Sequence, residues 1–257
     1  MLEFSKLQKG YMTKKDNATF DYDGSDLEAM MLAGNYYKWI AKKIKPYLGT
    51  RVVEVGAGVG SFSKHIDGLG KKELLLLEPS KKMFDLLNQN VSVFVNKNVH
   101  VENSYLSDAT KKIKDFSPDT FVYINVFEHI KDDVAEMKYI ANNLSSDGHV
   151  VIFVPALQSL YSNFDRSIDH YRRYTKKSIR ALINDADLEV VRLQYMDMPG
   201  ILPWWFSFVL MKRTKLVPLL VKTYDGLCVP IIRVLETFIQ PPVGKNILLV
   251  AAKKSNN

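Results

Sequence analysis

The sequence predicts a doubly wound α/β fold, in which helices cover both faces of one largely parallel sheet. Short apolar runs alternate with helical patterns along residues 27–196, which is typical of parallel strands joined by crossover helices. One of these runs, Leu74–Leu77, is apolar throughout, as expected of a strand that is buried on both faces. A glycine-rich turn, Gly56–Gly60, joins the first predicted strand to the helix after it.

The individual elements follow from periodicity and from residues that favour turns and helix ends. Strands are predicted at residues 52–55, 74–77, 99–102, 120–124, 149–154, 188–193 and 247–252. Helices are predicted at residues 27–44, 61–69, 80–90, 132–144 and 176–186. Ser80 and Thr175 are expected to cap the two helices that they precede, since a hydroxyl can accept from the free N–H groups there.

Length and composition exclude several classes of protein. The 257 residues suit one large domain, or one domain with a sizeable insertion. Apolar residues make up 47% of the chain and charged residues 25%, so an ordered globular protein is expected. The net charge of +7 favours an anionic partner, such as nucleic acid, a phospholipid surface or a phosphorylated substrate, although a solvated basic surface would have the same composition.

Three segments are predicted along the chain. Residues 1–25 form a polar, flexible N-terminal arm, and residues 26–196 with 246–254 form the α/β domain. Residues 197–245, between the two parts of the α/β domain, are the most apolar part of the chain and are expected to form a helical insertion before the last strand. No secretory signal and no apolar run of 18 or more residues is found, which predicts a cytoplasmic protein without a membrane span.

The insertion has four alternative roles. Aromatic residues Trp204, Trp205 and Phe206 precede Lys212 and Arg213, a pattern typical of a segment that lies in the membrane interface. We therefore expect peripheral contact with the inner face of a membrane through residues 199–213. A lid over a hydrophobic acceptor, a homodimer interface and additional core are the alternatives.

Cysteine and histidine usage indicates neither a disulfide nor a metal site. Cys228 is the one cysteine, and its apolar neighbours predict a small buried side chain. No spacing of His, Cys and Asp indicates a metal site.

The glycine turn carries the strongest chemical signal. It reads Glu54-Val55-Gly56-Ala57-Gly58-Val59-Gly60, and Glu78 ends the second predicted strand about 20 residues later, where a carboxylate can accept from ribose hydroxyls. Together they indicate a cofactor that contains adenosine. Ser61 stands where a dinucleotide-binding turn requires its third glycine, which disfavours a dehydrogenase. The acidic Glu54 beside the turn suits a cationic cofactor such as S-adenosylmethionine.

These residues resemble a known family. The turn at Glu54–Gly60, the acidic Glu78 and the segment Asn125–Ile130 are similar to class I S-adenosylmethionine-dependent methyltransferases of the type 11/12 kind. The resemblance covers roughly residues 35–195, and it implies a Rossmann-like seven-stranded sheet whose last strand, 247–252, is antiparallel. A narrower resemblance, through residues 164–166 and 169–175, is to a subgroup often met beside polysaccharide and glycolipid genes.

The resemblance also implies roles for individual residues. The cofactor-binding residues that it implies are Glu54, Gly56, Ala57, Gly58, Gly60, Glu78, Pro79 and Asn125. The glycine turn and Glu54 would hold the methionine part, Glu78 the ribose, and Asn125 would lie beside the reacting methyl group. The chain departs from many relatives after the third strand, because no acid in residues 102–108 aligns with the one that faces adenine.

The acceptor is expected to bind after the fifth strand, at the edge of the sheet where ligands bind in open α/β folds. His170 is the candidate general base, with Asp165 and Tyr171 as its catalytic neighbours. Arg172, Arg173 and Tyr174 are the candidate substrate-binding residues, since guanidinium groups bind phosphate or carboxylate with two hydrogen bonds. Alternatively, this segment forms a network that fixes the loop. For His129, we favour capping or packing over catalysis.

The sequence therefore predicts a methyltransferase that methylates a hydroxyl of a glycan, a glycolipid or another lipid-linked acceptor. A small soluble metabolite is the alternative acceptor, and a non-catalytic binding protein that retains the fold is the alternative class. Nucleic acid is disfavoured, because no Asn-Pro-Pro-Tyr-type element follows the fourth strand.

Overall fold

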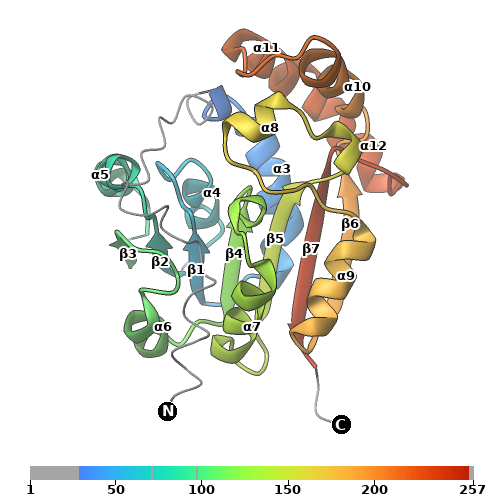
Figure 1. Ribbon diagram of the computed structural model, residues 1–257. Coiled ribbons are helices and arrows are strands. Elements are labelled where there is room, and N and C mark those ends of the chain that lie inside the picture. The colour runs from blue at the N-terminus through green and yellow to red at the C-terminus, as the bar shows by residue number, and fades with distance from the viewer. Residues whose placement is uncertain (1–28, 71, 97, 255–257) are drawn as a thin grey trace.

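The computed structural model describes residues 29–70, 72–96 and 98–254, and the predicted arm at residues 1–25 lies outside them. A seven-stranded sheet, in the order β3-β2-β1-β4-β5-β7-β6, forms the centre of the molecule (Figure 1). The strands are β1 (Arg51–Val55), β2 (Glu73–Leu77), β3 (Val99–Glu102), β4 (Thr120–Ile124), β5 (His149–Pro155), β6 (Leu188–Met196) and β7 (Asn246–Lys253).

Six strands of the sheet run parallel, and β7 runs antiparallel between β5 and β6. Because β1 lies at the point where the strand order reverses, the loops that follow β1 and β4 diverge at the carboxyl edge and leave room for a ligand. The predicted α/β fold with an antiparallel last strand is confirmed.

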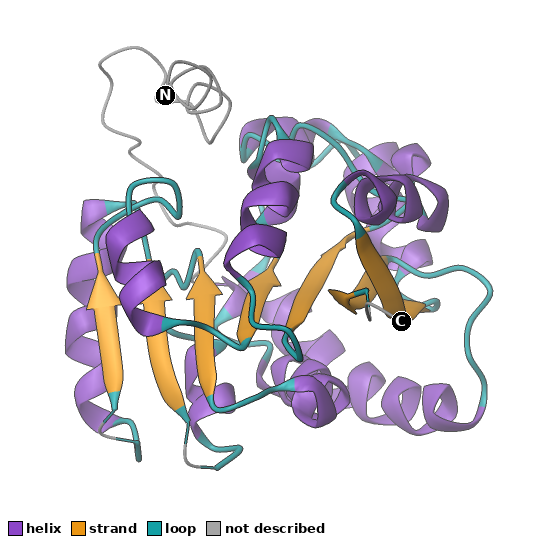
Figure 2. Cartoon of the chain, turned by 90° about the horizontal axis from the view of Figure 1, so that it is seen from below, coloured by secondary structure: helices purple, strands orange, loops and turns teal. Residues whose placement is uncertain are grey.

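Helices cover both faces of the sheet (Figure 2), as the alternating side chains of buried strands require. On one face, α6 (Thr110–Phe116), α7 (Asp133–Asn143) and α9 (Lys176–Asp185) pack against strand residues such as Val53 and Tyr123. On the other face, α3 (Gly34–Ile44), α4 (Ser63–Asp67) and α5 (Lys81–Asn90) pack against residues such as Val52 and Val122.

The helix ends follow local chemistry closely. Ser80 and Thr175 cap α5 and α9 as predicted, each accepting from a backbone N–H of the first turn. The helix predicted at residues 27–44 is interrupted: Ala29 and Met30 are helical, a turn follows at Met31 and Leu32, and α3 begins at Gly34. The helix α6 was not predicted, because its seven residues carry few apolar positions.

Residues 197–245 form helices α10 (Ile201–Trp204), α11 (Pro218–Thr223) and α12 (Val229–Phe238), with π-helical turns at Trp205–Leu210 and Tyr224–Cys228. Together with α8 (Asn163–Ser167) they lie above the carboxyl ends of the parallel strands (Figure 1). No helix in the described part of the chain is long and apolar enough to cross a bilayer.

Asp225 holds this segment against α3. Its two carboxylate oxygens accept from the backbone N–H groups of Asn35 and Tyr36, at 2.9 and 2.8 Å, and so cap the free amino end of α3. The fixed helices therefore contribute a wall to whatever binds at the sheet edge. The expectation that Cys228 is buried is wrong, because its thiol is exposed at the end of a π-helical turn.

Candidate functional site

The glycine turn lies where β1 ends and is fixed to the end of β2. The backbone N–H groups of Gly56 and Ala57 both donate to the carbonyl of Leu77, at 2.8 and 3.0 Å. Gly56, Gly58 and Gly60 have φ angles of +68°, +58° and +82°, a region that side chains other than glycine rarely adopt. A Cβ on Gly56 would come within 2.6 Å of Val126 Cγ2. The backbone conformation of the turn therefore requires glycine at these positions.

Glu78 is held against this turn. Its carboxylate accepts from the backbone N–H of Gly58 and from that of Ser80, each at 2.8 Å. Burial nevertheless raises the pKa of Glu78. These are the two hydrogen bonds to this carboxylate from the described residues, so it has further acceptor positions for the hydroxyls of a ribose. Asn103 donates to the backbone carbonyls of Glu78 and Pro79, which fixes the chain on either side of that position.

Glu54 is buried at the other side of the turn, with 3% of its surface exposed. Its Oε2 has no hydrogen-bond partner among the described residues. Burial raises the pKa of Glu54 to about 8. A buried carboxyl oxygen without a partner costs free energy, and a positively charged ligand group would remove that cost.

A cavity of about 480 Å³ opens beside the turn. Gly56, together with Ile124 and Asn125 from the end of β4, lines one side of it. Asn125 adopts a left-handed conformation, with φ of +54°, and its N–H donates to the carbonyl of Phe153 at 2.8 Å. The cavity is therefore partly lined by Gly56 and Asn125, two of the residues that the sequence predicts to bind the cofactor.

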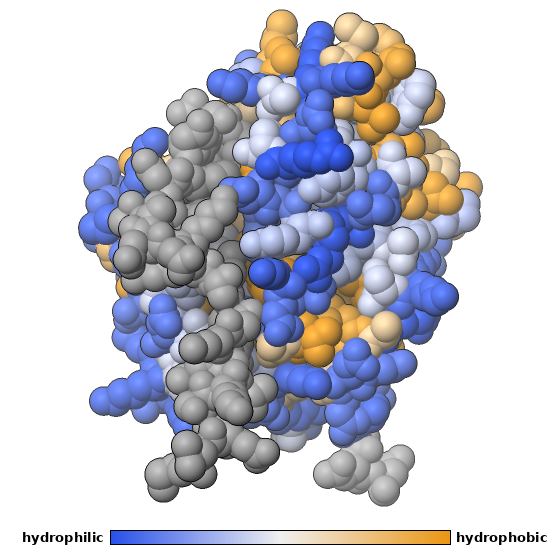
Figure 3. Space-filling view, in the orientation of Figure 1, coloured by the Kyte–Doolittle hydropathy of each residue, from blue (hydrophilic) through white to orange (hydrophobic). Residues whose placement is uncertain are grey.

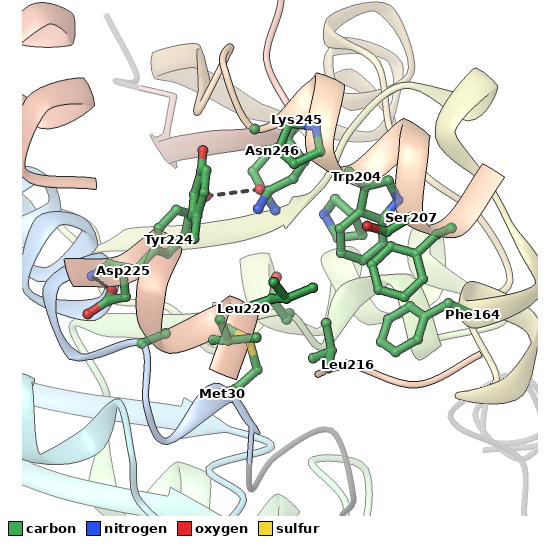
Figure 4. A pocket seen from close by; sticks show the side chains of 18 of the residues that line it. Met30, Phe164, Trp204, Ser207, Leu216, Leu220, Tyr224, Asp225, Lys245 and Asn246 are labelled. Atoms are coloured by element: carbon green, nitrogen blue, oxygen red, sulfur yellow. Dashed lines mark hydrogen bonds between the residues drawn. The ribbon is translucent and has the colours of Figure 1, made fainter. Parts of the chain in front are cut away.

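Most of the remaining wall is apolar and belongs to the helical insertion. Figure 4 shows Trp204, Leu216 and Leu220 around one part of the cavity, with Tyr224 and Asn246 at another. Tyr36 of α3 donates to Asn246 Oδ1 at 3.0 Å, the bond dashed in Figure 4. Lys245 also faces the cavity, where its ammonium pairs with Asp197 at 2.9 Å and lies 5.2 Å from the ring centre of Tyr36.

One polar cluster lines the cavity near Asn125: Glu128, His129 and His170. Glu128 and His129 belong to a short 3-10 turn that follows β4, Phe127–His129, and His170 to the loop after α8. His170 Nε2 lies 3.7 Å from Glu128 Oε1. The rings of His129 and His170 meet edge to face, with centroids 4.5 Å apart.

Asp165 orients His170 from behind. Its Oδ1 lies 3.0 Å from His170 Nδ1, and the same carboxylate pairs with the guanidinium of Arg173. Burial would raise the pKa of Asp165, but His170 and Arg173 outweigh burial and lower it to about 2. The charged Asp165 thus favours a proton on Nδ1 of His170, while Nε2 faces Glu128.

Arg173 connects this network to the insertion. Its guanidinium lies 4.6 Å from the ring centre of Trp204 and also donates to the carbonyl of Ala156. Arg173 is buried and lines the cavity. Any anion that it binds must therefore share it with Asp165.

The other residues predicted to bind or activate the methyl acceptor lie away from the cavity wall. Arg172 pairs with Asp133 at 2.7 Å, and the hydroxyl of Tyr174 donates to the same carboxylate at 2.8 Å. Burial raises the pKa of Tyr174 well above its usual value. Tyr171 is half exposed and packs on Arg172. Arg172 and Tyr174 fix the loop onto α7 through Asp133, as expected of a segment that forms a network.

Sequence reasoning missed Glu128 as a site residue and treated His129 as a capping or packing residue. The position of Glu128 and His129 in the sequence could have identified them as site residues, because they follow β4 at the edge of the sheet where the loop after β5 also begins.

Comparison with known proteins places this architecture in a family. Residues 26–193 match the family described as methyltransferase domain, so the chain belongs to that family. No curated protein sequence matches the chain.

Solved methyltransferase structures share the fold. Coclaurine N-methyltransferase, bound to N-methylheliamine and SAH, is 15% identical with a TM-score of 0.57, over 98% of this chain and 79% of that one. A SAM-dependent methyltransferase from Thermotoga maritima is 14% identical with a TM-score of 0.57, over 91% and 96% of the two chains. One from Archaeoglobus fulgidus is 17% identical with a TM-score of 0.56, over 86% and 94%.

The protein is thus a class I methyltransferase that depends on S-adenosylmethionine, and its residues fit that cofactor. The left-handed glycine turn allows close approach of a ligand, Glu78 keeps free acceptor positions, and the unpartnered oxygen of Glu54 suits a cationic group.

Proposed function

We propose that the protein methylates a hydroxyl group of a lipid-linked acceptor, such as a glycolipid, at a membrane surface. The observation that carries this proposal is the cavity, which runs from the polar cluster beside Asn125 to an apolar wall made by the helical insertion. An acceptor with a polar group at one end and a lipid at the other has the matching distribution of polarity.

At the cofactor end, Gly56, Gly58 and Gly60 would bind the methionine part, and Glu78 the ribose. When bound, S-adenosylmethionine supplies a methyl group on a positively charged sulfur, which is readily transferred. The protein must chiefly align the acceptor and exclude water, since positioning alone can provide effective molarities of about 10⁵ M or more. The insertion would help to exclude water, because its Trp204 and Phe208 pack on each other and on Phe164 of α8 beside the cavity.

At the acceptor end, the Glu128–His129–His170 cluster would meet the hydroxyl. A hydroxyl must lose its proton as it is methylated, and this cluster brings a carboxylate and two imidazoles to the part of the cavity that Asn125 also lines. The amine of a small metabolite would need less help with its proton, so the cluster favours an oxygen acceptor.

Charge at the other end of the cavity favours an anionic lipid. Arg213 and Lys215 line the cavity and are exposed, and the whole segment 199–224 carries four basic residues and no acidic one. Such residues attract the phosphate of a lipid-linked acceptor and the anionic head groups around it.

The outer surface of the insertion is apolar as well. Hydrophobic residues gather over α10, α11 and α12 in Figure 3, and Leu202, Leu219 and Phe238 expose 73%, 71% and 82% of their surfaces. Contiguous exposed apolar side chains mark an interaction surface, and those beside Lys212 and Arg213 match the pattern of an interfacial membrane segment.

Vesicle co-sedimentation tests this docking. The protein is expected to bind phosphatidylglycerol vesicles more strongly than phosphatidylcholine vesicles. The double variant Leu202→Glu/Leu219→Glu should bind at least about tenfold more weakly, since each buried leucine contributes about 1.5–3 kcal/mol. The matched control is Val93→Glu/Val95→Glu, two exposed valines near α5, which should bind as the unmodified protein does.

Equal binding by both double variants would contradict the proposed surface. If the protein is instead a stable dimer that loses its dimeric state on Leu202→Glu/Leu219→Glu, the apolar surface is a homodimer interface and the lipid proposal fails. Activity on a soluble metabolite with no lipid present would support the alternative acceptor.

A further inference from the structure

The fold brings together three potential metal ligands that the sequence keeps far apart. One ligand atom each from Glu128, His129 and His170 lies within 4.8 Å of the other two. Ligands that share one Zn²⁺ ion at about 2.1 Å lie roughly 3–3.5 Å apart, so a small inward movement of the three side chains would enclose an ion. No other group of this kind is found among residues 29–254 as described.

We propose that Glu128, His129 and His170 bind a divalent transition-metal ion of the Zn²⁺ class, with open coordination positions directed into the cavity. Two imidazoles and one carboxylate are a ligand set that binds such ions while leaving positions for water or substrate. All three residues line the cavity, so the open positions would face the acceptor.

The carboxylate of Glu128 is the strongest indication of a missing partner. Glu128 is fully buried, and neither of its oxygens has a hydrogen-bond partner among the described residues. A buried carboxylate without a hydrogen-bond partner is unfavourable in its charged form. A cation at this position would provide the missing interaction.

Both histidines are arranged as metal ligands are. A ligating imidazole usually donates its other N–H to a carboxylate or a backbone carbonyl, which fixes the ring and its tautomer. His170 meets Asp165 through Nδ1 at 3.0 Å while Nε2 faces Glu128. The ring of His129 is faced by the backbone carbonyls of Ile168 and Asp169.

The loop geometry holds this arrangement in place. The backbone N–H of Tyr171 donates to the carbonyl of Glu128 at 2.9 Å, and Asp169 adopts a left-handed conformation, with φ of +59°. The turn after β4 is thereby joined directly to the loop that carries His170.

The proposed site deepens the proposed function and rests on it in one respect, namely that the acceptor is a hydroxyl. A cation beside that hydroxyl would favour loss of its proton. His170 would then act as a ligand and not as the general base.

Isothermal titration with Zn²⁺, after dialysis against a chelator, tests the proposal without cofactor or acceptor. We expect one ion per chain, with a Kd below about 1 μM, and visible absorption bands when Co²⁺ is used instead. The variants His129→Ala, His170→Ala and Glu128→Gln should each weaken binding more than 100-fold. Asp165→Asn should weaken it by roughly 10–100-fold, the effect typical of an outer-shell partner.

The chain offers a matched control in His100, whose Nε2 lies 3.8 Å from Glu73 Oε1 on the surface. His100→Ala should bind Zn²⁺ as the unmodified protein does. Glu128→Gln removes a buried carboxylate that has no hydrogen-bond partner among the described residues, so its thermal midpoint should not fall, which separates loss of the site from loss of the fold.

The proposal is overturned if the unmodified protein binds no Zn²⁺ in this range, or if the three ligand variants bind it unchanged. The first result would return His170 to the role of general base. Binding of S-adenosylhomocysteine, measured on the same chelator-treated protein, reports on the proposed function separately.

Discussion

Replacement of Gly56 by alanine is expected to disable cofactor binding while leaving the protein folded. An alanine at φ of +68° costs about 1–2 kcal/mol, because its Cβ crowds the neighbouring carbonyl oxygen. The new Cβ would also lie 2.6 Å from Val126 Cγ2, whereas carbon atoms in contact rest at about 3.5–4.0 Å. Overpacking of this kind costs about 1–3 kcal/mol, so the turn as a whole loses about 2–5 kcal/mol.

The turn can relieve this strain only by moving away from Val126, and hence out of its binding conformation. Each 1.4 kcal/mol lost from binding is a factor of ten in Kd. Titration calorimetry with S-adenosylhomocysteine should therefore show affinity reduced by about 30-fold or more. Urea unfolding should show a lower free energy of unfolding.

Gly34→Ala is the control, since no described atom lies within 4 Å of the added Cβ and the residue begins α3. It should leave both the affinity and the free energy of unfolding within about 1 kcal/mol of the unmodified protein. If Gly56→Ala binds S-adenosylhomocysteine within threefold of the unmodified protein, the assignment of the turn to the cofactor is refuted.

Three further predictions concern buried carboxylates. Burial raises the pKa of Glu136 from 4.5 to about 7, which destabilises the folded protein by about 3 kcal/mol above pH 7 and not at all below pH 4.5. Urea unfolding of Glu136→Gln should therefore show a gain of that size in the free energy of unfolding at pH 8 and no gain at pH 4.5. A gain independent of pH would contradict burial of the charged carboxylate as the cause. Burial raises the pKa of Glu54 to about 8, so binding of S-adenosylhomocysteine at pH 7 should release a proton from Glu54. Calorimetry in two buffers with different ionisation enthalpies should detect this proton for the unmodified protein and not for Glu54→Gln. Equal proton release by both proteins would exclude Glu54 as its source. Asp225→Ala should lower the free energy of unfolding by about 0.5–2 kcal/mol through loss of the cap on α3, and an unchanged free energy would show that the cap is redundant.

Much of the fold is predictable because it follows from local patterns. Continuous apolar runs identify strands that are buried on both faces, and Gly56–Gly60 followed by Glu78 identifies the cofactor edge without knowledge of any distant contact. Short helices such as α6 are less predictable, because their apolar positions are set by the neighbouring strands and not by their own periodicity. The exposure of Cys228 is not predictable from its apolar neighbours either, because Leu227 before it is exposed whereas Val229 after it is buried.

The polar cluster of the cavity is not predictable from spacing. His170 lies 41 residues after His129, and the two rings meet only because the loops after β4 and β5 share an edge and are joined through the bond from Tyr171 to Glu128. Asp165 was predicted beside His170 and does lie there. Arg172 and Tyr174 were predicted to bind substrate, and their contacts with Asp133 direct them away from the cavity.

Transfer of a labelled methyl group to membrane lipids tests whether the protein methylates a lipid-linked hydroxyl. The purified protein would be incubated with methyl-labelled S-adenosylmethionine and a membrane extract of its own host, and the products separated into organic and aqueous phases, with Gly56→Ala as the inactive control. We expect label in the organic phase, in a product that mild alkali does not cleave, because a methyl ether resists mild alkali. Label confined to the aqueous phase, or to products that alkali cleaves, would contradict a lipid-linked hydroxyl acceptor.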